Sequence, residues 1–293
     1  MSFSTETKEE LSKINNLGNK EQVQAEFIGY LISSNTSIVN KEIKYATESE
    51  YNINRFSKLL NNMQIIDYQI NIQGKVFVIT FEAKELEKFA QLLIINKDCI
   101  NIKAKEFKES YFKSLIRGIF LGSGSINNPK AKYHLEISLS SEENREIISN
   151  KLYENGITVK ILDSKNSYPL YIKDGEEISK LLAFIGANQA VLKFEEVRVL
   201  RQMNNKVNRL VNCETANMNK TINAAVEQIN AIQKLKKTKK FDKLEDSLKE
   251  IAEVRLAHPN EPLSELGNYL KNPIGKSGVN YRLKKIIEIS QEN

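Results

Sequence analysis

Apolar residues recur at helical spacing in two segments within the first 130 residues of the chain. The stripe in the second segment consists of Phe112, Leu115, Ile116 and Ile119. Gly118 lies inside this stripe, where a missing side chain weakens the helix but lets another backbone approach closely. The spacing predicts helices over residues 24–34 and 111–121, and it predicts that the second packs against another helix.

The same order of elements follows each of these helices, at an offset of about ninety residues. A helix beginning near Asn54 or Asn144 separates a first strand from a pair of strands, and a last helix ends each half. The alternating pattern predicts strands over residues 42–47, 68–73 and 76–81, and again over 133–138, 158–162 and 168–172. The last helices are marked by Leu86, Phe89, Leu92 and Leu93, and by Ile178, Leu181, Leu182 and Ile185.

Each half is interpreted as running helix, two strands, helix, two strands, helix, an αββαββα order, and the alternating pattern places three of its four strands. This order favours an α+β fold with largely antiparallel sheets and helices on one face. The alternative is a coincidence between two ordinary α+β segments.

The chain after these halves changes character. Residues 194–235 are predicted to be mostly helical, and the lysine-rich run 234–240 has too little apolar content for a core. We interpret this run as a solvated linker, with non-specific phosphate contact as the alternative. The expected domains are residues 1–190 (halves about 1–100 and 107–190), a helical and basic linker over 191–245, and an all-α domain over 246–293.

Three short amphipathic helices are predicted between residues 247 and 290. The first ends at His258-Pro259, and Pro262, which a first helical turn tolerates, precedes the second, which closes at residues 272–275. The third begins near Ser277, a suitable N-cap. Its apolar stripe consists of Val279, Leu283, Ile286 and Ile287.

The outer face of the third helix has the chemistry with which helices read the major groove of DNA. Asparagine suits adenine edges, and lysine suits guanine or phosphate. We expect Asn280 and Tyr281 to lie toward base edges and Lys276 and Lys285 toward phosphates. The full set of expected contacts is Lys276, Ser277, Asn280, Tyr281, Arg282, Lys284 and Lys285. The alternative is a solvated face of a small interaction domain.

Composition is compatible with a polyanionic partner without requiring one, since the formal net charge is +6. Cys99 and Cys213 lie far apart, so we expect buried, reduced thiols rather than a disulfide framework. His134 and His258 do not cluster, and we expect no metal and no cofactor. The chain shows no signal-peptide pattern and no run of ~20 apolar residues, which predicts a cytoplasmic protein.

The string Gly-Ile-Phe-Leu-Gly-Ser-Gly at 118–124 resembles the core motif of LAGLIDADG homing endonucleases. In that family two such helices pack together and place metal-binding carboxylates at their C-terminal ends. Leu121 and Ser123 stand where the two aspartates would be, and Ser34 ends the other helix. A hydroxyl holds a hard divalent cation poorly, and Glu26 lies about two turns upstream at ~1.5 Å per residue. The resemblance therefore predicts a scaffold that is not an enzyme, with an active nuclease or maturase as the alternative.

Longer strings resemble the WhiA family of bacterial regulators. They include Arg-Leu-Val-Asn-Cys-Glu-Thr-Ala-Asn at 209–217 and Gly-Lys-Ser-Gly-Val-Asn-Tyr-Arg-Leu-Lys-Lys-Ile at 275–286, and the resemblance covers essentially the whole chain. It implies a degenerate, non-cleaving LAGLIDADG domain joined to a C-terminal helix-turn-helix.

The functions that the resemblance implies are cell division, chromosome segregation or sporulation gene control. We expect double-stranded DNA as the partner, a nucleoid-associated location, and RNA polymerase or another transcription factor as a further candidate partner. The alternative is a DNA-associated scaffold in chromosome segregation. Target promoters, the direction of regulation, oligomeric state and any small ligand stay open.

Overall fold

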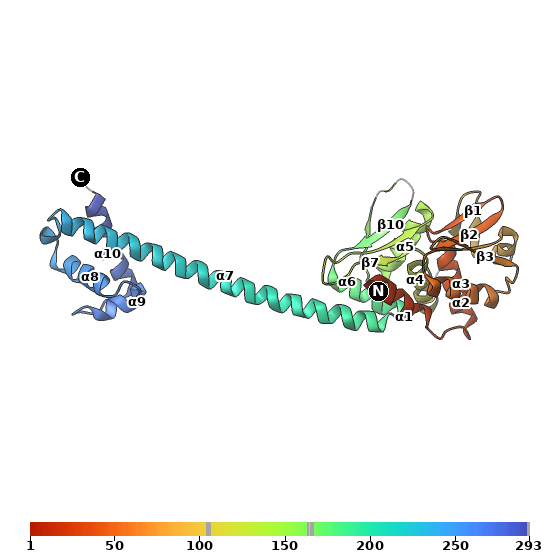
Figure 1. Ribbon diagram of the computed structural model, residues 1–293, viewed down its shortest axis with the longest axis horizontal. Helices are drawn as coiled ribbons and strands as arrows, with labels where there is room; N and C mark the ends of the chain where they lie inside the picture. Colours follow the sequence, from red (N-terminus) through yellow and green to blue (C-terminus); the bar gives the residue numbers. More distant parts are fainter. Residues whose placement is uncertain (104–106, 163, 165–166, 292–293) are drawn as a thin grey trace. The chain divides into compact units, whose positions relative to one another are not determined.

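The computed structural model describes residues 1–103, 107–162, 164 and 167–291 of the chain (Figure 1). The chain divides into two compact units, Met1–Arg201 and Gln202–Asn293.

The first half of unit 1 follows a short leading helix, α1 (Phe3–Ser12). Its sheet has the order β1-β2-β4-β3 with every pair antiparallel, and α3 packs on β2 and β4. The elements are α2 (Lys20–Leu31), β1 (Thr36–Val39), β2 (Glu42–Thr47), α3 (Glu50–Asn62), β3 (Tyr68–Gln73), β4 (Val76–Glu82) and the 3-10 helix η1 (Ala83–Phe89).

The second half repeats this arrangement after a small hairpin of β5 (Leu93–Ile95) and β6 (Ile100–Ile102). Its sheet has the order β7-β8-β10-β9, again antiparallel throughout, and α5 packs on β8 and β10. The elements are α4 (Glu109–Ser123), β7 (Ser125–Ile126), β8 (Leu135–Leu139), α5 (Glu142–Glu154), β9 (Lys160–Ile161), β10 (Tyr168–Ile172) and α6 (Gly175–Ile185). The duplicated α+β fold predicted from the sequence is confirmed.

Two details of that prediction are wrong. The last helix of the first half is only the 3-10 helix η1, and Leu93 begins strand β5, because its side chain is buried in a hairpin with Ile102. Asn54 is exposed and does not match Asn144. The residue that does is Asn52, because each is the third residue after a serine N-cap and each is fully buried.

Helices α2 and α4 pack together through glycines. A Cβ added at Gly29 would lie 2.3 Å from the Leu115 carbonyl oxygen, and one at Gly118 would lie 2.1 Å from the Glu26 carbonyl oxygen. No side chain fits between backbones this close, so glycine is required on both helices. The helix-to-helix contact predicted from Gly118 is confirmed, and it forms the seam between the halves.

Unit 2 contains most of α7 (Asn188–Lys237), whose first residues belong to unit 1. The end of α7 packs with η2 (Phe241–Lys243), α8 (Asp246–Ala257), α9 (Leu263–Leu266), η3 (Gly267–Tyr269) and α10 (Lys276–Gln291). The small core contains Ile232, Leu235, Leu248, Ile251, Leu266, Leu270, Val279, Leu283 and Ile286.

Two predictions for this region need correction. The lysine-rich run is not wholly a solvated linker, because α7 continues to Lys237 and Leu235 is buried in the core of unit 2. The second helix of the tail has one α-helical turn and then becomes the 3-10 helix η3. In the described residues, no helix combines the length and the apolar character needed to cross a bilayer.

Candidate nucleic-acid interface

Helix α10 buries one side and exposes the other as its sequence pattern predicts. Val279, Leu283 and Ile286 are fully buried, whereas Ile287 is only half-buried. At about 100° per residue, positions 277, 281 and 284 lie on the side opposite this stripe. The exposed members of the expected contact set are Lys276, Ser277, Asn280, Tyr281 and Lys284. Tyr281 is 68% exposed, so a large aromatic ring stands free on this face.

The other two expected contacts lie nearer to the body of unit 2. Arg282 and Lys285 are half-buried, and Lys285 Nζ lies 3.4 Å from Glu245 Oε1 just before α8. A phosphate that approaches Lys285 therefore competes with this carboxylate. Lys276 and Lys284 have no such partner among the described residues, which makes them better placed for phosphate contact.

A tight backbone approach fixes the connection that precedes α10. A Cβ added at Gly267 would lie 2.0 Å from the Ile274 carbonyl oxygen, and the Ile274 N–H donates to the Gly267 carbonyl at 3.3 Å. The neighbouring α8–α9 connection is held by Arg255, which is 1% exposed and donates to the carbonyl of Glu261 at 2.8 Å. Burial lowers the pKa of the Arg255 guanidinium. These contacts set the position of α10 relative to α8.

The net charge of the chain is concentrated in the unit that carries α10. Sixteen of the 43 Lys and Arg residues and eleven of the 37 Asp and Glu residues fall between residues 202 and 293. Unit 2 therefore has a formal charge of +5 out of +6, a balance that suits a polyanion.

The helix tips in unit 1 carry hydroxyl and amide groups. Leu121, at the first expected acid position, is fully buried in the core. Ser123 Oγ donates to the Ser138 carbonyl at 2.5 Å, and the side-chain amide of Asn35 donates to the Gly122 carbonyl at 2.7 Å. Ser138 Oγ in turn donates to Glu136 Oε1 at 3.3 Å. The described residues contain no group of three or more His, Cys, Asp or Glu side chains suited to a metal ion.

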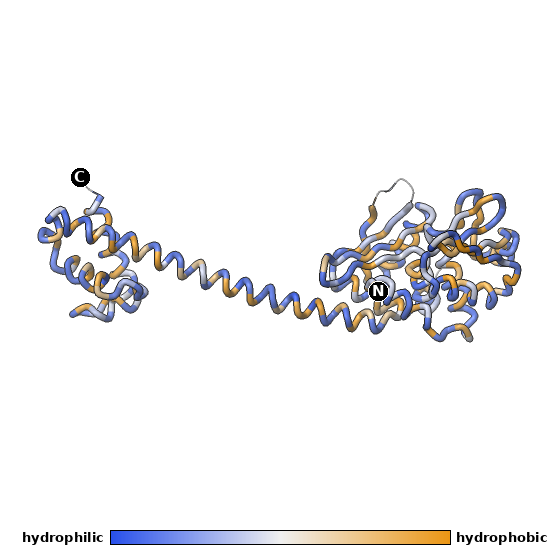
Figure 2. The backbone as a smooth tube through the Cα atoms, viewed as in Figure 1, coloured by the Kyte–Doolittle hydropathy of each residue, from blue (hydrophilic) through white to orange (hydrophobic). Residues whose placement is uncertain are grey.

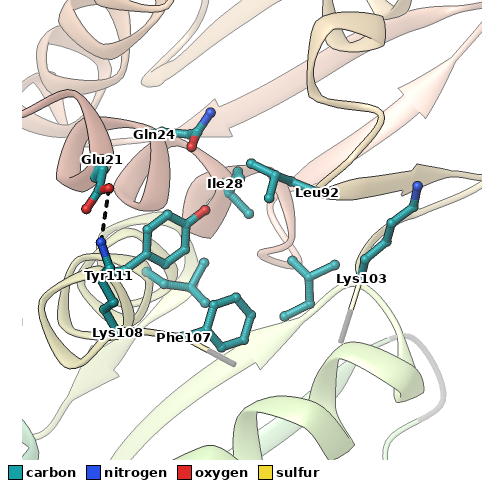
Figure 3. A pocket seen from close by; sticks show the side chains of 10 residues that line it. Glu21, Gln24, Ile28, Leu92, Lys103, Phe107, Lys108 and Tyr111 are labelled. Carbon is teal, nitrogen blue, oxygen red and sulfur yellow. Dashed lines mark hydrogen bonds and ion pairs between the residues drawn. The ribbon is translucent and has the colours of Figure 1, made fainter. Parts of the chain in front are cut away.

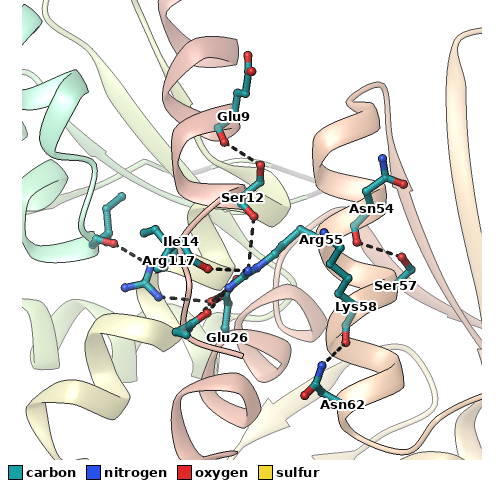
Figure 4. Close-up of polar contacts among 12 residues, drawn as sticks. Glu9, Ser12, Ile14, Glu26, Asn54, Arg55, Ser57, Lys58, Asn62 and Arg117 are labelled. Carbon is teal, nitrogen blue, oxygen red and sulfur yellow. Dashed lines mark hydrogen bonds and ion pairs between the residues drawn. The ribbon is translucent and has the colours of Figure 1, made fainter. Parts of the chain in front are cut away.

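Glu26 is also unavailable for metal binding because it is enclosed by cations (Figure 4). It accepts from Arg55 Nε at 2.7 Å and Nη2 at 2.9 Å, from Asn16 Nδ2 at 3.1 Å, and from Arg117 Nη1 at 3.4 Å. Arg117 also donates to the Ile185 carbonyl at 2.8 Å, and burial lowers its pKa. The cluster joins α2, α3, α4 and α6 and is part of the framework of the domain.

A pocket of about 210 Å³ lies near the beginnings of α2 and α4 (Figure 3). Its wall is largely apolar, and an ion pair between Lys108 and Glu21 at 3.4 Å lies at one side. Burial raises the pKa of Tyr111, which lines the pocket, to about 12. Its phenol is therefore neutral at physiological pH.

The predicted burial of the two cysteines is wrong. Cys213 is exposed on α7 and Cys99 is half-buried, and both are free. Cys213 lies in the segment 201–224, in which every residue is exposed, and apolar spacing alone did not reveal this exposure.

Two family models match the chain: the WhiA LAGLIDADG-like domain at residues 112–204 and the WhiA C-terminal HTH domain at residues 207–290. The chain is 36% identical to a probable cell division protein WhiA from Clostridium botulinum, over 100% of this chain and 98% of that protein. A WhiA protein of Clostridium perfringens is 48% identical, but that match spans only 57% of its length and 61% of this chain. The crystal structure of full-length DUF199/WhiA from Thermatoga maritima matches with a TM-score of 0.60 and 30% identity, over 99% of this chain and 98% of that one.

Proposed function

Because the chain belongs to the WhiA family, we propose that it is a sequence-specific DNA-binding regulator of transcription that does not cleave DNA and acts in cell division. The observation that supports this proposal most strongly is α10, which presents Asn280, Tyr281 and three further polar or basic side chains on one free face of a positively charged helical unit. A helix with these groups fits the major groove.

Selection of bound fragments from the host genome by the full chain tests the proposal directly. The expected result is a small set of related sites in promoter regions. Binding that depends on salt but not on sequence would instead favour the scaffold function in chromosome segregation. RNA polymerase or another transcription factor is a further proposed partner, for which co-retention on the selected promoters is the test.

Replacing Asn280 by Ala is expected to cost about 1 to 3 kcal/mol of binding free energy at the preferred site and little on scrambled DNA. The amide can pair with a base edge, whereas random sequence offers it no fixed partner. Lys284→Ala is the matched variant. Loss of a phosphate contact should weaken binding to both duplexes and reduce the slope of log affinity against log salt concentration by roughly one unit. Salt titrations on the two duplexes measure both effects, and equal losses for Asn280→Ala would argue against base reading.

No Mg²⁺-dependent cleavage of duplex DNA is expected at any salt concentration. Leu121 is apolar, and the Ser123 hydroxyl donates a hydrogen bond to the Ser138 carbonyl. These two positions therefore offer no carboxylate pair for a divalent cation. Incubation of supercoiled plasmid with purified protein and Mg²⁺ or Mn²⁺ is the measurement. Nicking that disappears in Ser123→Ala or Glu136→Gln would contradict the prediction.

A further inference from the structure

Helix α7 exposes large apolar side chains along one face of unit 2. Every residue from 201 to 224 is exposed, and the apolar ones keep between 50% and 63% of their surface exposed. These side chains follow three- and four-residue spacing and belong to Met203, Val207, Leu210, Val211, Met218 and Ile222. We call this set the α7 stripe, and Figure 2 shows the mixture of apolar and polar positions along the helix. Contiguous exposed apolar surface usually marks an interaction site.

The α7 stripe leads into a groove of about 540 Å³. One wall is α7, with Ile222, Val226 and Ile229, and the other is the α8–α9 connection at Pro259 and Asn260. Further along α7, residues on the same face pack in the core of unit 2. The apolar face is thus covered at its end and uncovered over the preceding turns, a shape that accepts an amphipathic helix.

The exposed part of α7 has a low helix propensity. Seven asparagines occur between residues 204 and 223, and asparagine is a weak helix former. Most helices owe their stability to packing of an apolar face, which this segment lacks within unit 2. A partner that covers the α7 stripe would supply that packing.

Glu214 lies in the middle of the α7 stripe. It follows Leu210 by four residues and precedes Met218 by four, so it shares their face. No hydrogen bond or ion pair of Glu214 occurs among the described residues. A partner that buries this carboxylate among apolar side chains must supply a cation, because a buried charge without a counter-charge is unfavourable.

A second copy of this chain does not meet that requirement. A two-fold pair places the same patch on both partners, so Glu214 would face Glu214 in a parallel pair. The α7 stripe itself contains no Lys or Arg, and Arg209 and Lys220 lie on the side of α7 opposite the stripe, so neither faces Glu214 in an antiparallel pair. In either arrangement the α7 stripe of a second copy therefore supplies no cation for Glu214.

We propose that the α7 stripe and its groove bind an amphipathic helix of a different protein, which carries a Lys or Arg opposite Glu214. The apolar side chains supply the contact area, and the single buried ion pair sets the register and selects the partner. This proposal is independent of DNA recognition by α10.

Two synthetic amphipathic helices of 24 residues test the proposal, identical except for a central Lys in one and a central Glu in the other. Fluorescence anisotropy with the full chain is expected to show at least tenfold tighter binding of the Lys peptide. Glu214→Lys should reverse this preference. Glu227→Lys is the matched control, because residue 227 lies on the opposite side of α7 and should leave the preference unchanged.

Met218→Asp should lower the affinity for both peptides at least tenfold, while circular dichroism of the variant shows an unchanged helix content. Hydrogen exchange across residues 203–223 should slow only with the preferred peptide. Absence of binding by either peptide, or equal affinity for both, would overturn the proposal. A stable wild-type dimer in sedimentation that Met218→Asp dissociates would assign the α7 stripe to a second copy instead.

Discussion

Replacing Glu26 by Gln is expected to lower the free energy of unfolding of the duplicated domain by about 3 to 5 kcal/mol. The carboxylate is fully buried and compensates the guanidinium groups of Arg55 and Arg117, which are 2% and 10% exposed at their side chains. A neutral amide leaves both cations buried without a counter-charge. Urea unfolding followed by hydrogen exchange in peptides from α2 and α4 reports on this domain alone.

Glu21→Gln is the control for this experiment, because Glu21 pairs with Lys108 at the surface and its side chain is 64% exposed. Exposed pairs contribute little, so no measurable change is expected. Equal stability of Glu26→Gln and the wild type would show that the buried cluster is not required for the fold.

Replacing Gly267 by Ala is expected to cost unit 2 about 3 kcal/mol and to abolish most DNA binding. The new methyl would lie 2.0 Å from the Ile274 carbonyl oxygen, and a backbone atom cannot move aside as a flexible side chain can. The chain before α10 must therefore shift. A small core supplies roughly 3 to 5 kcal/mol, so the loss leaves few molecules with α10 in place, and apparent affinity falls with the folded fraction.

Gly275→Ala is the matched variant eight residues later. A Cβ at Gly275 meets no atom within 4 Å, so stability and DNA affinity should stay near wild type. Binding titrations on the selected site, together with thermal unfolding, compare the two variants. Full DNA affinity in Gly267→Ala would mean that α10 does not depend on this close approach.

Much of the architecture follows from local pattern. Period-two alternation placed β2, β4 and β10, and helical spacing placed α4 and the buried face of α10, because both repeats reflect which side of an element meets the core. The prediction failed where a segment is short. Residues 83–95 became a 3-10 helix and a strand because pairing with β6 outweighed an apolar spacing that also fits a helix.

The sequence predicted which α10 residues contact DNA, and the structure then showed which of these residues are exposed. The sequence put Lys285 on the outer face of α10, whereas Glu245, forty residues earlier, holds its ammonium group near α8. A pairing between residues so far apart leaves no periodic signal.

The sequence by itself determined the duplicated α+β order, the helical tail, the loss of carboxylates at the helix tips and the family, because each is written in residue type or spacing. The tertiary structure alone decided that Glu26 is neutralised by Arg55 and Arg117, that Gly29 and Gly267 lie against other backbones, and that Cys213 and the α7 stripe are exposed. These features depend on which distant segments meet, and the burial of a side chain is a property of its neighbours in space.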